Sequence, residues 1–259
     1  MSLHVESSGP QDAPAIVFLH GAGISSWMWT SQIAALNTRY RCITIDLPGN
    51  GDSHRTPWRS MAETSDQVAE VIRACTANGK AHLVGLSLGG YTAMSVLDRH
   101  PSRVESVVVS GMTARPFENQ RRWKIMLGII SRLVNFGPMI WLNTKMMRLP
   151  ADAAAAMTRD MQRMSGETLK TIYAELLPYA LPRSLGTLEH RVLAVAGDQE
   201  AAAIRNDLAE FPKLMPNAKA AVAADAHHGW SGEHPELFTA MIDAWISGTP
   251  LPAKLRVMA

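Results

Sequence analysis

The 259-residue sequence has few features that would tie it to a membrane, to nucleic acid or to disulfide chemistry. No stretch approaches about eighteen consecutive apolar residues, and the N-terminus has no basic segment followed by an apolar one. We therefore expect a soluble cytoplasmic protein without a membrane partner. Lys and Arg number 25 against 23 Asp and Glu, which gives no reason to expect a nucleic-acid partner. The two cysteines, Cys42 and Cys75, predict isolated buried thiols.

Signatures of bound cofactors are also missing. The sequence has no P-loop, no G-x-G-x-x-G after a strand-like run, and no His and Cys cluster at metal-ligand spacing. We therefore predict a site that uses neither a cofactor nor a metal and that acts on a small molecule.

Apolar runs and amphipathic segments alternate along most of the chain, in which hydrophobic residues make up 47%. Continuous apolar runs are typical of strands covered on both faces, and a 3.6-residue periodicity is typical of helices. Strands are predicted at 15–19, 41–46, 81–84, 104–110, 191–197 and 218–223, and helices at 61–76, 90–97, 201–211 and 235–245. This order predicts an α/β fold with a doubly wound, mostly parallel sheet.

The most informative motif is G-L-S-L-G-G at 85–90, between a predicted strand and a predicted helix. So sharp a corner strains the serine backbone and brings strand and helix together, so that side chains two residues on either side of Ser87 would clash. Gly85 and Gly89 remove both clashes. The corner exposes Ser87 Oγ as a nucleophile and turns the Leu88 N–H toward a bound carbonyl oxygen.

The alternation of strands and helices stops between residues 112 and 185. This segment holds eight of the fifteen methionines and eleven Lys and Arg against five Asp and Glu. We interpret 112–185 as a helical cap inserted into a core made of 1–111 and 186–259. Because flexible thioethers adapt to varied acyl groups, an apolar pocket above the serine is predicted. Its candidate lining residues are Trp123, Met126, Trp141 and Met157.

Polar residues follow two late strands, at 197–200 and at 225–230. A serine hydroxyl is a weak nucleophile, so an imidazole must accept its proton and a carboxylate must hold that imidazole in the right tautomer. The chain order serine, acid, histidine fits this requirement. Asp198, Glu200 and Asp225 are the candidate acids.

Taken together, these motifs resemble the α/β-hydrolase fold superfamily from about Leu3 to Ser247, closely in the core and weakly in the cap. The matching segments are H-G-A-G at 20–23, similar to the family's HGxG loop, D-L-P-G-N-G-D-S at 46–53, the elbow at 85–90, and the closing H-x4-E-x-P-E at 228–236.

The resemblance implies a serine hydrolase in which Ser87 attacks and His228 shuttles the proton. It places the oxyanion donors at the N–H groups of Ala22 and Leu88. His20 is expected to brace the loop that carries Ala22 rather than to act as a base.

The resemblance also places the acid three residues after the strand-end glycine. That position is Glu200, where family members commonly carry Asp. Asp198 and Asp225 are the competing carboxylates, expected to be a surface charge and a turn residue. His227 lacks the family spacing to Glu233 and is expected to be structural.

A serine at the elbow argues against the haloalkane dehalogenase and epoxide hydrolase branches, which use Asp there. The leading expectation is a Ser-His-Glu hydrolase that cleaves small-molecule carboxylic esters through an acyl-enzyme. One alternative is a carbon-carbon bond hydrolase or lyase that acts on an acidic metabolite, which the basic cap supports. Another is a ligand receptor of the same fold with slow turnover. The protein is expected to be a monomer or a homodimer.

Overall fold

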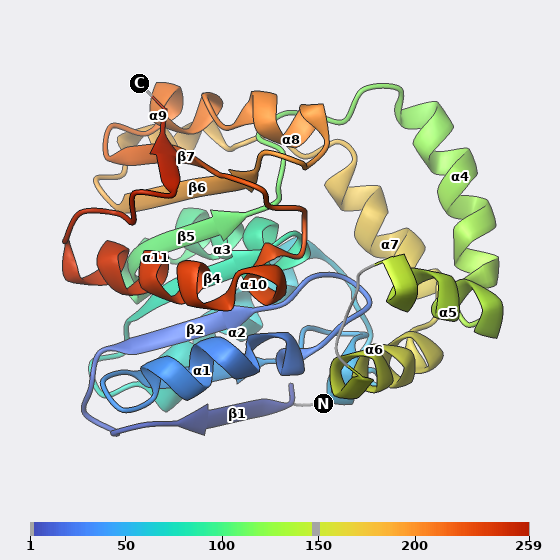
Figure 1. The fold of residues 1–259 in the computed structure, drawn as a ribbon, viewed down its shortest axis with the longest axis horizontal. Coiled ribbons are helices and arrows are strands. Elements are labelled where there is room, and N and C mark those ends of the chain that lie inside the picture. The colour runs from blue at the N-terminus through green and yellow to red at the C-terminus, as the bar shows by residue number, and fades with distance from the viewer. Residues whose placement is uncertain (1–2, 147–150, 259) are drawn as a thin grey trace.

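The computed structural model describes residues 3–146 and 151–258, which fold around an eight-stranded sheet (Figure 1). The strand order is β1-β3-β2-β4-β5-β6-β7-β8. Strands β2 to β7 are parallel, whereas β1 and β8 pair antiparallel at the two edges. The strands are β1 Val5–Ser8, β2 Ala15–Leu19, β3 Arg41–Ile45, β4 Ala81–Leu86, β5 Val104–Ser110, β6 Arg191–Gly197, β7 Ala218–Ala223 and β8 Leu255–Val257.

Helices cover both faces of the sheet, as the predicted doubly wound fold requires. Helices α1 and α11 pack on one face, and α2, α3 and α9 pack on the other (Figure 1). The core helices are α1 Thr30–Leu36, α2 Met61–Cys75, α3 Leu88–Arg99, α8 Ala202–Asp207, α9 Glu210–Leu214, α10 Trp230–Glu233 and α11 Pro235–Ser247, with 3₁₀ turns at Ser26–Trp29, Gly51–Ser53, Pro101–Arg103 and Arg183–Thr187.

Strand β2 shows why the central strands are continuously apolar. Ile16 and Phe18 face the layer that contains α1 and α11, while Val17 and Leu19 face the layer that contains α2 and α3. All four side chains are fully buried. Successive side chains point to opposite faces of a strand, so a strand covered on both faces has no polar position.

Three details differ from the sequence-based expectation. The edge strands β1 and β8 were not predicted, because they are short and only partly apolar. The helix predicted at 201–211 is two helices, α8 and α9. The break falls at residues 208 and 209, and Pro212 lies in the first turn of α9, where a missing N–H is tolerated. In a helix continuous with α8, the ring of Pro212 would clash with the carbonyl of Leu208. Of the two thiols, Cys42 is buried but Cys75 is half-buried.

Four helices lie between β5 and β6, within the segment predicted as a cap, and no strand occurs in its described parts, 112–146 and 151–185. They are α4 Gln120–Leu133, α5 Gly137–Met146, α6 Ala151–Arg163 and α7 Gly166–Leu176. Figure 1 shows them beyond the carboxyl ends of the parallel strands. Met147 and Arg148 of the predicted cap lie outside the described residues. Within the described ranges, no helix has the length and apolarity that a membrane span requires.

Candidate active site

Ser87 occupies a strained corner between β4 and α3. Its φ of 53° and ψ of −118° are rare for a residue with a side chain. A Cβ on Gly85 would lie 2.2 Å from the Gly89 carbonyl oxygen, and one on Gly89 would lie 2.0 Å from the Leu19 carbonyl oxygen. Both glycines are therefore required by close backbone approach, as the motif predicts. The Ser87 N–H donates to the Ser110 carbonyl oxygen at 2.8 Å, which ties the corner to β5.

The loop after β2 is held in place by His20, which is fully buried. The ring donates from Nδ1 to the Gly21 carbonyl oxygen at 2.7 Å and accepts the Leu47 N–H at Nε2 at 2.9 Å. Burial lowers the pKa of His20, so the ring stays neutral in this tautomer. Asn50 Oδ1 accepts the Gly23 N–H at 2.9 Å. His20 thus braces the loop, in agreement with its expected role.

The backbone N–H groups of Ala22 and Leu88 donate no hydrogen bond to any residue that the structure describes. The loop that carries Ala22 lies beside the serine, since a Cβ on Gly21 would lie 3.7 Å from Ser87 Cβ. Two unpaired N–H groups next to a candidate nucleophile can bind the oxygen of a ligand carbonyl.

Glu200 and His228 come together from the ends of two neighbouring strands. Glu200 follows β6, His228 follows β7, and Glu200 Oε2 lies 3.6 Å from His228 Nδ1. The Glu200 side chain is completely buried, and its two oxygens accept no hydrogen bond from the described residues. A buried carboxylate without donors is costly unless a positive charge faces it. Among the described residues, His228 is the side chain that pairs with this carboxylate.

The other candidate residues have different partners. Asp198 Oδ1 accepts the Ala226 N–H at 3.3 Å, and a hydrogen bond from the Asp225 backbone is the main cause that lowers the Asp198 pKa. Asp225 is exposed and adopts a left-handed turn conformation with φ 54°. Neither carboxylate pairs with His228 within the described chain.

His227 points elsewhere as well. Its Nδ1 lies 3.3 Å from Glu233 Oε2, and the same oxygen accepts the His227 N–H at 3.0 Å. These bonds close the turn that presents His228. His227 therefore has the structural contacts that its position in the sequence suggests.

Gly111 is a site residue that sequence reasoning missed. It directly follows β5 and has a φ of 69°, and a Cβ there would lie 2.6 Å from His228 Cε1 and 2.8 Å from Nδ1. The same Cβ would lie 3.5 Å from Glu200 Oε1. The imidazole thus stacks against bare backbone at this position. Only the S-G pair at the end of a predicted strand could have indicated it.

A cavity of about 870 Å³ opens between the core and the cap. Ser87 and His228 both line it, and so do Trp123 and Met126 from α4. The other lining residues are Tyr91, Gly111, Thr113, Arg115, Pro116, Phe117, Glu118, Asn119, Arg122, Tyr173, Leu176, Ala201, Ala203, Ile204, Asn206 and Asp207. A cavity of this volume is in the range that binds small molecules.

The prediction that Trp141 and Met157 line this pocket is wrong. Trp141 lies on the outer side of α5 with 60% of its surface exposed. Met157 is buried on the inner side of α6 among the residues that pack the cap onto the core. Methionine and tryptophan content alone does not show which side of a helix faces the pocket.

Polar groups that line the pocket are fixed by their neighbours. Asp207 accepts the N–H groups of Ala114 and Arg115 at 2.9 Å and the Arg115 guanidinium at 2.8 Å and 2.5 Å. The Tyr91 hydroxyl accepts the Thr113 N–H at 3.0 Å and lies 2.9 Å from Thr113 Oγ1. One hydroxyl hydrogen of this pair therefore remains free to donate to a bound molecule.

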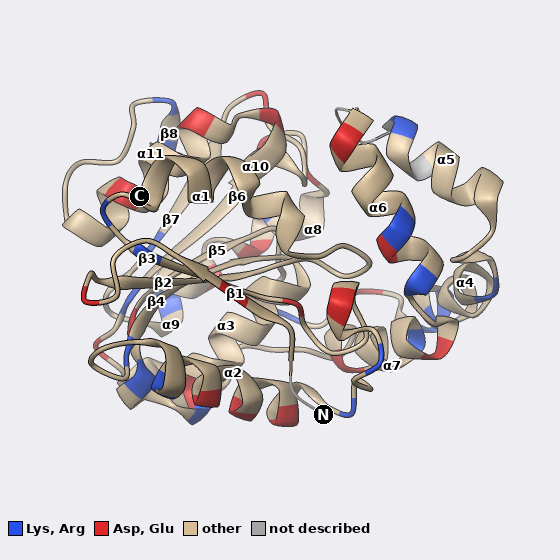
Figure 2. Cartoon of the chain, turned by 90° about the horizontal axis from the view of Figure 1, so that it is seen from below, with Lys and Arg blue, Asp and Glu red and all other residues tan. Residues whose placement is uncertain are grey.

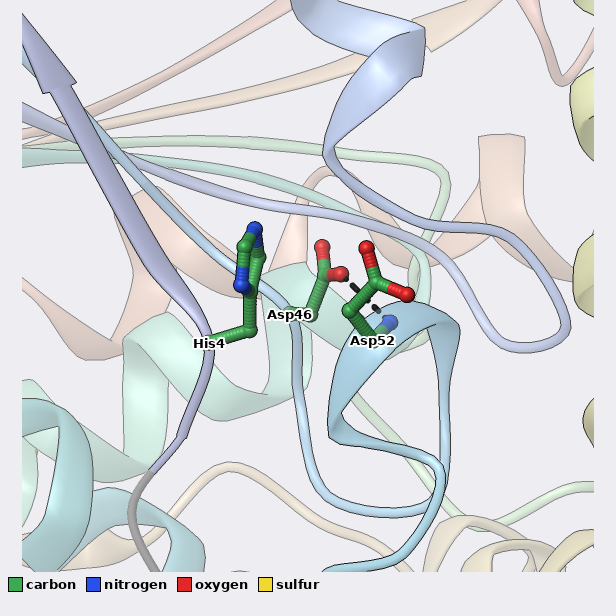
Figure 3. A group of neighbouring side chains, drawn as sticks. All are labelled: His4, Asp46 and Asp52. Atoms are coloured by element: carbon green, nitrogen blue, oxygen red, sulfur yellow. Dashed lines mark hydrogen bonds between the residues drawn. The ribbon is translucent and has the colours of Figure 1, made fainter.

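Figure 3 shows His4, Asp46 and Asp52, whose ligand-type atoms lie within 4.8 Å of one another. Asp46 already accepts the Ser26 N–H at 2.9 Å, the Ser26 hydroxyl at 2.5 Å and the Asp52 N–H at 2.9 Å. Asp52 pairs with Arg163 of α6 at 2.7 Å. Because these bonds occupy the carboxylates, the group is explained as a support for the loops around the site.

A model of the alpha/beta hydrolase family matches residues 16–241. The chain therefore belongs to this family, and it is an enzyme. Over 95% of its length it is 24% identical to 3-oxoadipate enol-lactonase 1 of Acinetobacter baylyi, of which it covers 93%. Over 49% of its length it is 37% identical to an uncharacterized carboxylesterase, nap, of Bacillus subtilis, of which it covers 43%.

The fold is shared with solved structures of the same class. The enol-lactonase from Burkholderia xenovorans superposes with a TM-score of 0.81 at 21% identity, over 95% of this chain and 96% of that one. At this identity the likeness shows the fold alone.

Proposed function

We propose that this enzyme hydrolyses small-molecule carboxylic esters through an acyl-enzyme on Ser87. The observation that carries the proposal is the buried carboxylate of Glu200, 3.6 Å from His228 Nδ1, beside the cavity that His228 and Ser87 both line. With Nδ1 directed at Glu200, Nε2 is the ring nitrogen left to exchange a proton in the cavity.

In the first half of the reaction, Ser87 Oγ attacks the ester carbonyl carbon and its proton passes to His228 Nε2. The carbonyl oxygen becomes an oxyanion, which the N–H groups of Ala22 and Leu88 stabilise by about 3 kcal/mol each. The carbon-oxygen bond to the alcohol then breaks, and His228 returns the proton to the leaving oxygen. Glu200 favours the protonated imidazole throughout these steps.

In the second half, a water molecule attacks the acyl-enzyme and gives a proton to His228. The bond from Ser87 Oγ to the acyl carbon breaks, the serine regains the proton, and a carboxylic acid leaves. The names of the relatives include a carboxylesterase and an enol-lactonase. Both linear and cyclic esters are therefore reasonable first substrates.

The test is steady-state turnover of p-nitrophenyl esters from acetate to octanoate, together with labelling by a fluorophosphonate probe. Wild-type protein should turn over the esters and take up the probe, whereas Ser87→Ala should do neither. Residual catalysis in the variant should be no more than about 10³ to 10⁴ above the water rate. Near-native turnover by Ser87→Ala would disprove the proposal. Probe labelling without ester turnover would favour a slow receptor or a carbon-carbon bond hydrolase.

A further inference from the structure

Helices α4 and α5, and Phe136 in the turn between them, carry large apolar side chains in contact with solvent. We define the cap patch as Ile125, Ile129, Phe136, Trp141 and Leu142, which are 47% to 69% exposed. Ile125 and Ile129 are four residues apart and lie on one side of α4. The other large exposed apolar side chains of the described chain are Met126, on the pocket side of α4, and Val257 and Met258 near the C-terminus. Such a concentration marks an interaction surface.

The charge on these helices has one sign. No Asp or Glu occurs between Glu118 and Asp152. Figure 2 shows cationic bands on both α4 and α5. The cations in the described part of this stretch are Arg121, Lys124, Arg132 and Lys145, together with Arg122, which also lines the cavity. None of them forms a salt bridge with a described residue, whereas Arg163 and Lys170 of α6 and α7 do.

A second copy of the chain is a poor occupant of this surface. A two-fold dimer would bring the same patch face to face and oppose cation to cation without a neutralising acid. An anionic bilayer matches both the exposed apolar side chains and the unpaired cations of this surface. Apolar side chains enter the boundary between headgroups and acyl chains, and the cations meet the phosphates.

We propose that the cap patch docks this enzyme on membranes that contain anionic phospholipid. This binding is peripheral and independent of the proposed ester hydrolysis. This proposal differs from the expectation of no membrane partner. The sequence shows the charge and the apolar content of these helices but not which of their side chains are exposed. Since α4 also lines the cavity through Trp123 and Met126, docking brings the pocket wall to the lipid surface.

The first test is cosedimentation with vesicles. Protein should bind vesicles of equal phosphatidylglycerol and phosphatidylcholine at least about tenfold more tightly than vesicles of phosphatidylcholine alone. Raising the salt concentration from 0.05 M to 0.5 M should weaken the binding, because exposed charges are screened. Ser87→Ala protein should bind as well as wild type, which separates docking from catalysis. Failure of wild-type protein to bind the anionic vesicles would overturn the proposal.

The second test uses matched variants. Ile125→Gln combined with Ile129→Gln and Trp141→Gln should weaken binding to anionic vesicles by about tenfold or more, because the apolar anchors are gone. The control, Val257→Gln with Met258→Gln, removes exposed apolar side chains elsewhere and should bind normally. Equal loss in both variants would contradict the proposal. Since all these side chains are exposed, the melting temperature should stay within a few degrees of wild type.

The charge is tested in the same way. Lys124→Glu with Arg132→Glu should weaken binding, while Lys219→Glu with Lys254→Glu, which changes the net charge equally, should have a smaller effect. Sedimentation velocity then decides between occupants. If wild-type protein is a dimer that the apolar triple variant converts to a monomer, and vesicle binding is unchanged, the patch is a self-association surface and the membrane proposal is wrong.

Discussion

The side chains of the core site and those of the outer cap differ in burial and in the contacts that hold them. In the core, Glu200 is buried against His228, and the strained Ser87 is fixed by close backbone contacts. On the outer cap helices, Ile125 and Lys124 are exposed, and Lys124 forms no salt bridge with a described residue. The difference suggests that the core determines the chemistry and that the cap determines what reaches it.

The cap itself has an anchored half and an outer half. Asp160 of α6 accepts the Trp27 indole N–H at 2.7 Å, and Glu175 of α7 accepts the Met61 N–H at 2.5 Å. Burial is the main cause that raises the pKa of both carboxyl groups. No such bond to the core is made by the described side chains of α4 and α5. Variants in the core should therefore change kcat, and variants in α4 should change KM or surface binding.

The largest expected effect comes from the acid. Glu200→Gln keeps the side-chain shape but disfavours the productive tautomer of His228, so kcat should fall by up to about 10⁴. Asp198→Asn removes a charge from the same loop and should be nearly silent. The measurement is kcat for a p-nitrophenyl ester. A greater loss of kcat in Asp198→Asn than in Glu200→Gln would show that Asp198, rather than Glu200, is the acid.

The next effect should come from Gly111→Ala. The new Cβ would meet the imidazole of His228 at 2.6 Å, and the φ of 69° would be strained. Because a displacement of about 1 Å can cost about 10² in rate, kcat should fall by that order while the protein remains folded. Gly128→Ala, where the added Cβ meets nothing within 4 Å, is the matched control. Full activity of Gly111→Ala would mean that the imidazole does not need its present position.

A smaller effect is expected from the pocket wall. Trp123→Ala should raise KM for esters with longer acyl chains by about tenfold. The loss of one methylene-sized contact in a hydrophobic pocket has an effect of about this size or larger. Trp141→Ala removes the same side chain from the outside of the cap and should leave KM for soluble esters unchanged. Chain-length profiles of kcat/KM would show the contrast. Equal effects in the two variants would remove the distinction between inner and outer cap surfaces.

The smallest effect at neutral pH concerns the stability of the core. Burial lowers the pKa of His82 in β4 to about 4, below its ordinary value of 6.5. Between pH 6.5 and pH 4, His82 is therefore protonated in the unfolded chain but not in the folded chain. The free energy of unfolding falls as the pH drops through this range, by roughly 3 kcal/mol at most. His82→Gln should flatten this fall in thermal unfolding curves. A variant with the same pH dependence as wild type would show that other groups control it.

The central strands and the elbow could be predicted from the sequence because they depend on residues that are close together in the chain. A continuous apolar run such as 15–19 has few alternatives, and glycines around Ser87 follow from a steric clash that any such corner produces. Glu200, which the resemblance to the family proposes as the acid, lies with Oε2 3.6 Å from His228 Nδ1.

The remaining features depend on tertiary packing. Whether Met126 or Met157 faces the pocket depends on how each helix is rotated against the core, and a helix with apolar residues on several sides does not fix that rotation. Apart from the S-G pair that closes its strand, nothing in the sequence indicates the role of Gly111, because its neighbour in the fold, His228, is distant in the sequence. The cap patch could not be predicted from the sequence either, because the exposure of a side chain is a property of the assembled fold.

The bonds of Asp207 bear on how a ligand enters and leaves. Its carboxylate holds Ala114 and Arg115, where the chain enters the cap, and Ser184 bonds to Asp98 where the chain returns to the core. These bonds fix the backbone where the cap joins the core, and a swing of the whole cap would also break the bonds of Asp160 with Trp27 and of Glu175 with Met61. Exchange of ligands is therefore expected through small separations of α4 from α7 rather than through a hinged opening. In a hydrogen-exchange experiment, the Ala114 and Arg115 amides should remain protected while amides at the ends of α4 exchange early.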